Sequence, residues 1–587
     1  MSAVRAWRAT AAIAYRAWPA GAIGRLVITV VVLVCTGLLP GLALRAVLEG
    51  GGAVWMVILA TSAVIPLATG SVWEWFQRGL MLRTNQAATH AVMVAALAPA
   101  GIEHLESPRY ADAMEVVRSN ARTPALLFDW MATAVGSVVS VGASVAVLAS
   151  VHPLLLAPVA GAAGLGGVHA LTRRRALVYL DGALPGQRLA RRLAELGTSP
   201  ALAKEVRSLG LASWLVDRHR REVDAVTTRL VRGERGPVVA SAGAGVVQAL
   251  LLGLGFAWLV HLAATGRAST GDLALGVVVV RAAVEQAAAM GMTMGSDLAR
   301  NTHVARRYLW LLDYRSELSQ PEQPSPVPER LRTGIRLENV TFWYEDARRP
   351  ALQSVSLVLP AGATVALVGD NGAGKSTLVK LLCRFYDPQE GRVTVDGTDL
   401  REFDLDGWRA AATGAFQDFV KFRFLAGEAI GVGDLPASVD ASRVAAAAAA
   451  GGAAPFVEQL PMGYATQLGR DFPGGADLSE GQWQKVALSR ALMRGEPLLV
   501  VLDEPTACLD ARAEHDTFER FAAEAAAARQ CGGITLLVSH RFSTVAMADL
   551  IVVLERGRVV EVGTHSDLIE AGGEYAELYQ LQSRRYR

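Results

Sequence analysis

A glycine-rich stretch at residues 369–377, GDNGAGKST, could bind phosphate. It fits the pattern GxxxxGK[ST] and lies between an apolar run and a helical run. Glycines let backbone amides approach phosphate oxygens, and the helix N-terminus adds partial positive charge. Lys375 is expected to bridge the β- and γ-phosphates, and Ser376 to bind Mg²⁺. The predicted nucleotide-binding residues of this P-loop are Gly369, Asp370, Asn371, Gly372, Ala373, Gly374, Lys375, Ser376 and Thr377.

Two adjacent acids, Asp503 and Glu504, end a second apolar run, LLVVLDE. A carboxylate at a strand end beside a P-loop can hold the metal, so Asp503 is predicted as a metal ligand. A second carboxylate can polarise the attacking water, so Glu504 is predicted as the general base. A solvated acid pair would explain the run on its own, but the P-loop favours triphosphate hydrolysis.

A third stretch, GGADLSEGQWQK at residues 474–485, has three glycines and two acids before a helical run. It could be a loop that opens a helix, or part of a catalytic site. Glu480 stands where a glycine would be easier to explain, because a carboxylate repels a nearby phosphate.

Length and composition indicate what kind of protein carries these motifs. The 587 residues exceed one compact core, and 52% are hydrophobic whereas only 19% are charged. The net charge of +2 gives no indication of a nucleic-acid partner. The four cysteines lie far apart without a histidine cluster, which favours neither a metal site nor a disulfide framework.

Six long apolar runs lie in the first half, each near or above the roughly 20 residues that span a bilayer. They predict a six-span α-helical membrane domain in contact with membrane lipids. Arginines alternate between the connections, so both termini are predicted to be cytoplasmic. The runs are residues 25–48, 54–76, 126–151, 153–171, 238–265 and 273–294.

Proline and charged residues at 316–334 predict a linker, after which short β-branched runs alternate with helical patterns. The predicted organisation is a transmembrane domain with long cytoplasmic extensions at 1–315, the linker, and an α/β P-loop NTPase domain at 335–587.

With these motifs in this order, the whole chain resembles ATP-binding cassette (ABC) transporters of the exporter type, in which membrane and nucleotide domains are fused, as in multidrug or peptide exporters. The resemblance implies that Tyr344 stacks on adenine and that Gln417 senses Mg²⁺ and the γ-phosphate. It implies that residues 478–482 are the signature motif, Asp510 the D-loop aspartate and His540 the switch histidine. The implied catalytic set is Glu504, His540 and Gln417, with Ser376, Gln417 and Asp503 on the metal.

The resemblance also implies that the signature faces the P-loop of a second half-transporter, with Ser479, Gly481 and Gln482 at the partner's nucleotide. The chain is then half of a dimer. Glu480 departs from the family's LSGGQ. A homodimer is favoured over a heterodimer, and both stay open. Residues 204–226 and 108–118 resemble the regions that form coupling helices.

Arg281 and Glu285 lie four residues apart in the sixth run. A mutually satisfied pair packed against another helix is favoured over a substrate contact. Met290, Met292 and Met294 are core filling or an adaptable cavity wall.

The function that these features predict is ATP-driven export by alternating access across a bacterial-type inner membrane, with ATP and Mg²⁺ as cofactors. The cargo is a small molecule, a lipid or a peptide. Import of a siderophore-like molecule and lipid flipping are the alternatives.

Overall fold

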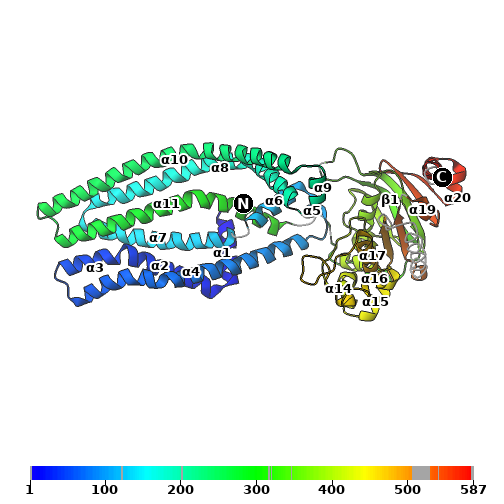
Figure 1. Cartoon of the computed structure of the whole chain (residues 1–587), viewed down its shortest axis with the longest axis horizontal. Helices are drawn as coiled ribbons and strands as arrows, with labels where there is room; N and C mark the ends of the chain where they lie inside the picture. The colour runs from blue at the N-terminus through cyan, green and yellow to red at the C-terminus, as the bar shows by residue number, and fades with distance from the viewer. Residues whose placement is uncertain are drawn as a thin grey trace. The chain divides into compact units, whose positions relative to one another are not determined.

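The computed structural model describes residues 3–120, 123–199, 202–314, 318, 320–345, 347–504, 529–539 and 541–583. Two compact units divide the chain. The first consists of Met1–Ala98 and Pro108–Tyr314, and the second of Pro99–Ser107 and Arg315–Arg587. The first unit is helical, whereas the second contains two β-sheets with helices (Figure 1).

Long helices lie side by side in the first unit (Figure 1). Helix α8 packs against α10 and α11, α11 also packs against α7, and α2 packs against α4 and α7. The helices are α1 (Ala3–Ala17), α2 (Pro19–Gly37), α3 (Leu39–Leu48), α4 (Ala53–Leu97), α6 (Pro108–Ser119), α7 (Thr123–Val151), η1 (Pro153–Leu155), α8 (Leu156–Thr198), α9 (Ala203–Ser208), α10 (Ala212–Ala264) and α11 (Thr270–Asp313).

Four helical segments among the described residues are long and apolar enough to cross a membrane. They are Pro19–Leu48, Ala53–Leu97, Thr123–Val151 and Ala212–Ala264, which contain the first, second and third predicted spans and all but the last residue of the fifth. The fourth predicted span overlaps a shorter apolar stretch, Pro153–Val168. The sixth lies in α11, where the side chains of residues 289–300 are outside the described set. The count of six spans therefore stays a prediction.

The first span is two helices rather than one, because α2 ends at Gly37 and α3 begins at Leu39. Pro40 lies in the first turn of α3. Its ring has no N–H and clashes with the carbonyl four residues earlier, so a proline breaks a continuous helix. Pro40 therefore explains the break, although the apolar run by itself predicted one continuous helix.

Arg25 is buried inside the helical unit, with its side chain 1% exposed. Its Nε donates to Oδ1 of Asp129 at 2.7 Å, and its guanidinium lies 4.3 Å from the ring centroid of Trp73. Gln77 donates to the other oxygen of Asp129 at 3.4 Å. In the sequence, Arg25 is only the first residue of the first apolar run, and nothing there indicates a partner. The structure makes it the centre of a polar cluster between α2, α4 and α7.

Two sheets form the framework of the second unit. The larger has the order β10-β9-β3-β8-β7-β6, and the smaller β2-β1-β4-β5. The strands are β1 (Gly334–Phe342), β2 (Leu352–Pro360), β3 (Thr364–Val368), β4 (Glu390–Val395), β5 (Thr398–Asp399), β6 (Ala412–Ala415), β7 (Leu499–Asp503), β8 (Ile534–Val538), β9 (Leu550–Glu555) and β10 (Arg558–Gly563).

The central strands β3, β7 and β8 are almost continuously buried, which suits their unbroken apolar sequences. The helices of this unit are α5 (Glu103–Glu106), α12 (Lys375–Leu382), η2 (Leu400–Glu402), α13 (Leu405–Ala411), α14 (Ala426–Gly431), η3 (Leu435–Ala437), α15 (Ala441–Ala450), α16 (Ala454–Val457), η4 (Gly463–Ala465), α17 (Glu480–Ala491), α19 (Phe542–Val545), α20 (His565–Ala571) and α21 (Glu574–Ser583). The predicted class, a helical apolar region followed by an α/β domain, is confirmed.

The short segment Pro99–Ser107 belongs to the second unit, although helices of the first unit precede and follow it. Glu106 accepts a hydrogen bond from Lys380 Nζ at 2.6 Å and one from the hydroxyl of Tyr386 at 2.5 Å. The amide of Ile102 donates to the carbonyl of Phe385 at 3.4 Å. The coupling helix of the first connection was predicted at 108–118. This range forms α6 of the first unit, and its role as a coupling helix stays a prediction.

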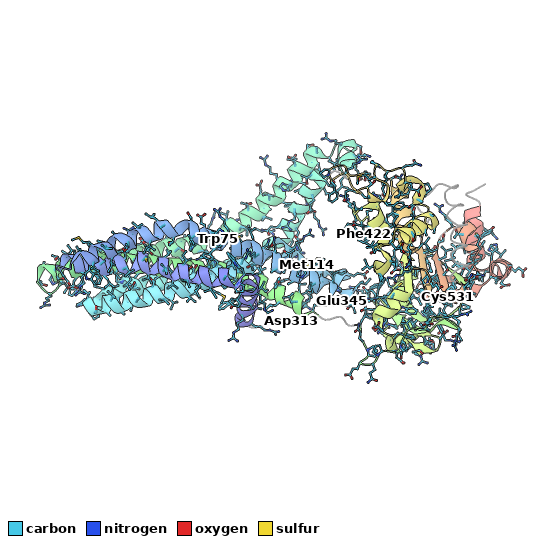
Figure 2. The ribbon with its side chains drawn as sticks, turned by 90° about the horizontal axis from the view of Figure 1, so that it is seen from below. Trp75, Met114, Asp313, Glu345, Phe422 and Cys531 are labelled. Carbon is cyan, nitrogen blue, oxygen red and sulfur yellow. The ribbon has the colours of Figure 1, made fainter. Side chains whose placement is uncertain are left out.

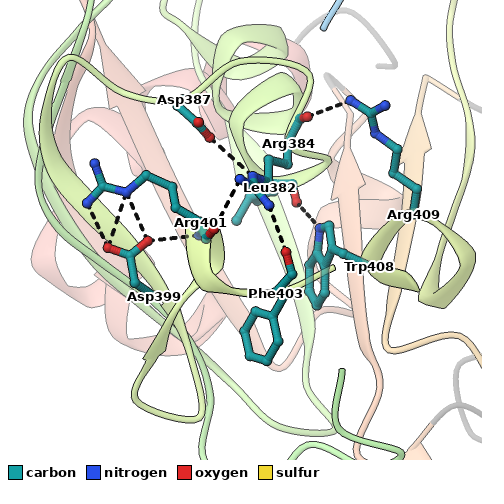
Figure 3. Close-up of polar contacts among 8 residues, drawn as sticks. All are labelled: Leu382, Arg384, Asp387, Asp399, Arg401, Phe403, Trp408 and Arg409. Carbon is teal, nitrogen blue, oxygen red and sulfur yellow. Dashed lines mark hydrogen bonds and ion pairs between the residues drawn. The ribbon is translucent and has the colours of Figure 1, made fainter. Parts of the chain in front are cut away.

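A buried arginine stabilises the region behind the P-loop helix (Figure 3). Arg384, which is fully buried, donates to the carbonyl of Phe403 at 3.1 Å and to that of Arg401 at 3.2 Å. Trp408 Nε1 donates to the carbonyl of Leu382 at 2.9 Å. Burial raises the pKa of Asp387, and the guanidinium of Arg384 opposes this rise. These contacts tie the end of α12 to η2 and α13.

We predict that Asp129→Ala destabilises the helical unit, because it leaves the buried charge of Arg25 without its anion. The expected loss of unfolding free energy is about 3 kcal/mol. Thermal unfolding of the purified chain in detergent measures the effect. The matched control is Glu74→Ala, which breaks the exposed pair Arg78–Glu74 in the same unit and should change the midpoint little. Equal midpoints for the two variants would contradict the prediction.

Candidate nucleotide site

Four parallel strands, β3, β8, β7 and β6, are neighbours in the larger sheet. The carboxyl ends of parallel strands lie at the same edge, where α/β sheets bind their ligands. Val538 of β8 is paired with Leu367 on one side and with Asp503 on the other, so the strand ends are level. The loops after these strands therefore bring the predicted motifs together.

A polar cavity of about 290 Å³ lies at this edge. It gathers residues that are separated by up to 194 positions in the chain, from Tyr344 to Val538. Its lining is Tyr344, Ala351, Asn371, Gly372, Gly374, Lys375, Ser376, Thr377, Gln417, Asp503, Glu504 and Val538. The predicted P-loop, aromatic, glutamine and acid pair thus share one cavity.

The P-loop requires glycine at positions where the backbone is left-handed. Gly369 has φ +148°, and an added Cβ there would lie 2.1 Å from the carbonyl oxygen of Leu554. Gly374 has φ +107°, and its Cβ would lie 2.9 Å from the carbonyl oxygen of Ala351. Both positions exclude a side chain, and α12 begins directly afterwards at Lys375. Gly369, Asp370 and Ala373 shape the loop but do not line the cavity.

Lys375 lies at the centre of the loop. Its Nζ donates to the carbonyl oxygens of Gly369 at 2.6 Å and Asp370 at 2.9 Å. Burial lowers the pKa of this ammonium, while the charges of Glu504 and Asp503 oppose the fall. The ammonium is therefore held by the loop itself and faces the two acids across the cavity.

The acid pair ends strand β7. Burial raises the pKa of Asp503 to about 6, and the neighbouring charge of Glu504 contributes to the rise. Glu504 has φ +49°, a left-handed conformation that non-glycine residues rarely adopt and that is frequent at functional sites. Gln417 Nε2 donates to Oε2 of Glu504 at 3.1 Å, and the backbone amide of Glu504 donates to the carbonyl of Val538 at 2.9 Å. These bonds fix the direction of the carboxylate.

Ser376, Gln417 and Asp503 offer hydroxyl, amide and carboxylate oxygens to the same cavity. Hard oxygen donors of this kind suit Mg²⁺, which binds through few protein ligands and takes phosphate and water oxygens as the rest. Within the described ranges, no group of three or more His, Cys, Asp or Glu side chains could hold a metal by itself. The residues fit a magnesium ion that arrives with a phosphate.

Tyr344 stands at the cavity edge beside the P-loop helix. Its hydroxyl lies 3.1 Å from Oγ1 of Thr377, and Lys380 Nζ lies 5.2 Å from its ring centroid. The face of an aromatic ring next to a phosphate site offers a stacking surface for a base.

The predicted signature residues do not line this cavity. Ser479 caps α17: its hydroxyl accepts from the amide of Gln482 at 3.3 Å, and its own amide donates to Oε1 of Gln482 at 2.8 Å. Gly481 lies in the first turn of the same helix. The stretch therefore opens a helix whose N-terminus is an anion-attracting end.

The carboxylate of Glu480 forms an ion pair with a lysine side chain. Its Oε2 accepts from Lys421 Nζ at 2.6 Å, and the two side chains are 55% and 42% exposed. Lys421 is one of only five lysines in the chain, and its role here was missed because 59 residues separate the partners. The sequence offered only the rarity of lysine as a signal.

Two predicted site residues, Asp510 and His540, lie outside the described residues. Their predicted roles remain predictions.

Comparisons with known proteins agree with the geometry. Residues 352–507 match the family model described as ABC transporter. The chain is 40% identical over 273 residues to an ATP-dependent lipid A-core flippase of Hahella chejuensis, a match covering 46% of this chain and 45% of the relative. It is 33% identical over 401 residues to an ATM1-type heavy metal exporter of Novosphingobium aromaticivorans, covering 68% of this chain and 63% of the relative. The matches thus span less than two thirds of either relative.

The fold similarity extends further along the chain. A solved structure, described as a bacterial Atm1-family ABC exporter with ATP bound, superposes with a TM-score of 0.73 and 26% identity. It covers 97% of this chain and 98% of the solved one. The resemblance predicted from the motifs is confirmed.

We predict that binding of magnesium–nucleotide weakens below about pH 6, because the raised pKa of Asp503 leaves this carboxyl protonated there. A proton and a metal then compete for the same oxygens, so apparent affinity should fall up to about tenfold per pH unit. Titration with a non-hydrolysable ATP analogue measures this. Asp503→Asn, or excess EDTA, should remove the carboxyl-linked component. A wild-type pH profile that matches the Asp503→Asn profile would refute the assignment.

Proposed function

We propose that this chain, an ABC transporter with the exporter fold, hydrolyses ATP to move a substrate out across a membrane as one half of a dimer. One observation supports the proposal most strongly: the P-loop, Tyr344, Gln417, Asp503 and Glu504 line a single cavity at the strand ends. The cavity thus combines groups that can bind phosphate, an adenine base and a metal ion with a carboxylate that can activate water.

Each residue then has a role in hydrolysis. The P-loop amides and Lys375 hold the β- and γ-phosphates, while Tyr344 stacks on adenine. Glu504 accepts a proton from the attacking water, and the hydrogen bond from Gln417 keeps its carboxylate aimed at the γ-phosphate side. Mg²⁺, when bound at Ser376, Gln417 and Asp503, supplies positive charge to the phosphate oxygens. His540 and Asp510 complete the proposed site.

The signature requires a second chain in this proposal. Ser479, Gly481 and Gln482 lie away from the cavity of their own chain and would meet the nucleotide of the partner. Two identical chains satisfy both sites with one type of interface, so a homodimer is favoured over a heterodimer.

The proposed location is a bacterial-type inner membrane with both termini in the cytoplasm, which the alternating arginines support. Nucleotide binding would close the dimer and hydrolysis would reset it.

The cargo remains a small molecule, a lipid or a peptide. Lipid flipping is the second candidate, favoured by the relative described as a lipid A-core flippase. The relatives and the solved structure are described as exporters or flippases, which does not favour import.

Arg281 and Glu285 are the strongest candidates for a contact with cargo. Arg281 Nε donates to Oε1 of Glu285 at 2.9 Å, as the spacing predicts. Among the described residues, no helix covers this pair, whose side chains are 75% and 64% exposed. Exposed charges within a membrane span favour a water-filled path over lipid. The methionines 290, 292 and 294 have side chains outside the described set.

We predict that Glu504→Gln abolishes turnover but retains ATP binding, and traps a closed dimer. Lys375→Ala should lose both binding and hydrolysis, because the phosphate loop then lacks its cation. Steady-state phosphate release and nucleotide binding by the purified chain measure these effects. Substantial turnover by Glu504→Gln would exclude Glu504 as the base. A chain that is active only with a second half-transporter would exclude the homodimer.

We predict that Arg281→Gln alters which compounds stimulate ATP hydrolysis but leaves thermal stability nearly unchanged. An exposed pair contributes little to folding, whereas a charge in the transport path contacts cargo. Arg78→Gln, which breaks the exposed i,i+4 pair with Glu74 in α4, is the matched control. A large drop in unfolding temperature with an unchanged stimulation profile would make the pair structural.

A further inference from the structure

We propose that Lys421 is a positioning residue of the signature motif. Its ammonium holds the carboxylate of Glu480 aside, so that the N-terminus of α17 stays open to the triphosphate of a second nucleotide. The inference rests on the proposed function, in which each signature meets the nucleotide of the partner chain.

The first residue of α17 creates an electrostatic conflict. The N-terminus of a helix attracts anions through its free N–H groups and its dipole. Glu480 begins α17, so its own carboxylate competes with a phosphate for that end. Two anions at one site also repel each other. A signature with an unpaired Glu480 would therefore bind a triphosphate poorly.

The contact with Lys421 resolves this conflict. The distance of 2.6 Å from Nζ to Oε2 is that of a short, charge-assisted hydrogen bond. The pair is neutral as a whole, and the carboxylate is engaged by a residue of another segment rather than by the first turn of α17. The hydroxyl of Ser479 and the backbone of Gly481 are left at the helix end.

The position of Lys421 is fixed by α17 itself. Arg490, in the last turn of α17, donates to the carbonyl of Val420 at 3.2 Å, and its guanidinium lies 4.8 Å from the ring centroid of Phe422. Phe422 packs against the core of the helical part of this unit, where Figure 2 labels it. The residues on both sides of Lys421 are thus tied to the helix whose first residue it neutralises.

The same segment also contacts Glu504, the proposed general base in this chain's own cavity. Gln417, four residues before Lys421, donates to the carboxylate of Glu504, and Gln484 of α17 donates to the backbone carbonyl of Glu504 at 3.4 Å. The signature and Glu504, the proposed general base for the chain's own nucleotide, are therefore linked through residues 417–422 and α17. A change at Glu480 can reach Glu504 by this route.

Other acids beside the signature are also paired, which provides a matched control. Asp477, three residues before Glu480, pairs with Arg470 at 2.8 Å. This pair is exposed and close to the signature, but it does not include the first residue of α17.

A purely structural role predicts a different result. Exposed ion pairs add little to folding stability, so breaking the Lys421–Glu480 contact should leave unfolding and turnover nearly unchanged. A positioning role predicts instead that nucleotide affinity falls and that removing the charge of Glu480 restores it.

The experiment compares ATP hydrolysis by five forms of the full chain: wild type, Lys421→Ala, Lys421→Arg, Lys421→Ala with Glu480→Gln, and Arg470→Ala. We expect Lys421→Ala to raise KM for ATP by about tenfold with little change in kcat, because ground-state binding is lost. Lys421→Arg, the double variant and Arg470→Ala should stay within about twofold of wild type. Unfolding temperatures of all five should agree closely.

Hydrolysis is complemented by a measurement that needs no turnover. In a Glu504→Gln background, Lys421→Ala should raise the ATP concentration that is needed to close the dimer. Cross-linking between the two copies measures how much of the dimer is closed.

An unchanged KM in Lys421→Ala, or no rescue by Glu480→Gln, would overturn the role of Lys421 while leaving the proposed function intact. Hydrolysis that survives Glu504→Gln and Lys375→Ala would instead overturn the proposed function. If the wild-type chain neither hydrolyses ATP nor forms a closed dimer with ATP, no second nucleotide meets Glu480. That result would overturn both the role of Lys421 and the proposed function.

Discussion

The parallel register of β3, β8, β7 and β6 is the constraint on which the nucleotide site depends. Val538 is level with Leu367 and Asp503, so the P-loop and the acid pair begin at the same height of the sheet. Each functional group comes from a separate loop, and a shift of one strand would move its group by one residue and reverse its side chains. These strands are almost continuously buried, so that shift is unfavourable because every displaced side chain would have to be repacked inside the core.

Features within one short stretch could be predicted from the sequence. The P-loop, the acid pair and the helix at the signature depend on glycine placement, apolar runs and capping, which are local. The Arg25–Asp129 cluster could not be predicted, since 104 residues separate its charges and only helix packing brings them together. The same holds for Lys421 and Glu480. The membership of Pro99–Ser107 in the second unit could not be predicted, because its four-residue helix has too little periodicity to be recognised.

Charge in this chain is used sparingly and with defined partners. Four of the five lysines lie in the ABC domain, and three of these have the specific contacts described above: Lys375 with the loop carbonyls, Lys380 with Glu106, and Lys421 with Glu480. An ammonium on a flexible stem forms a point contact that can be exchanged for another anion, whereas the buried guanidinium of Arg384 donates in several fixed directions.

The membership of Pro99–Ser107 in the second unit gives the chain three covalent crossings between its units, after Ala98, after Ser107 and after Tyr314. The second unit is therefore assembled from two separate stretches of the chain, and the shorter stretch lies between helices that belong to the first unit. A fragment that begins at residue 315 would lack Glu106, the hydrogen-bond partner of Lys380 and Tyr386. The folded unit is therefore larger than the continuous stretch of sequence that forms most of it.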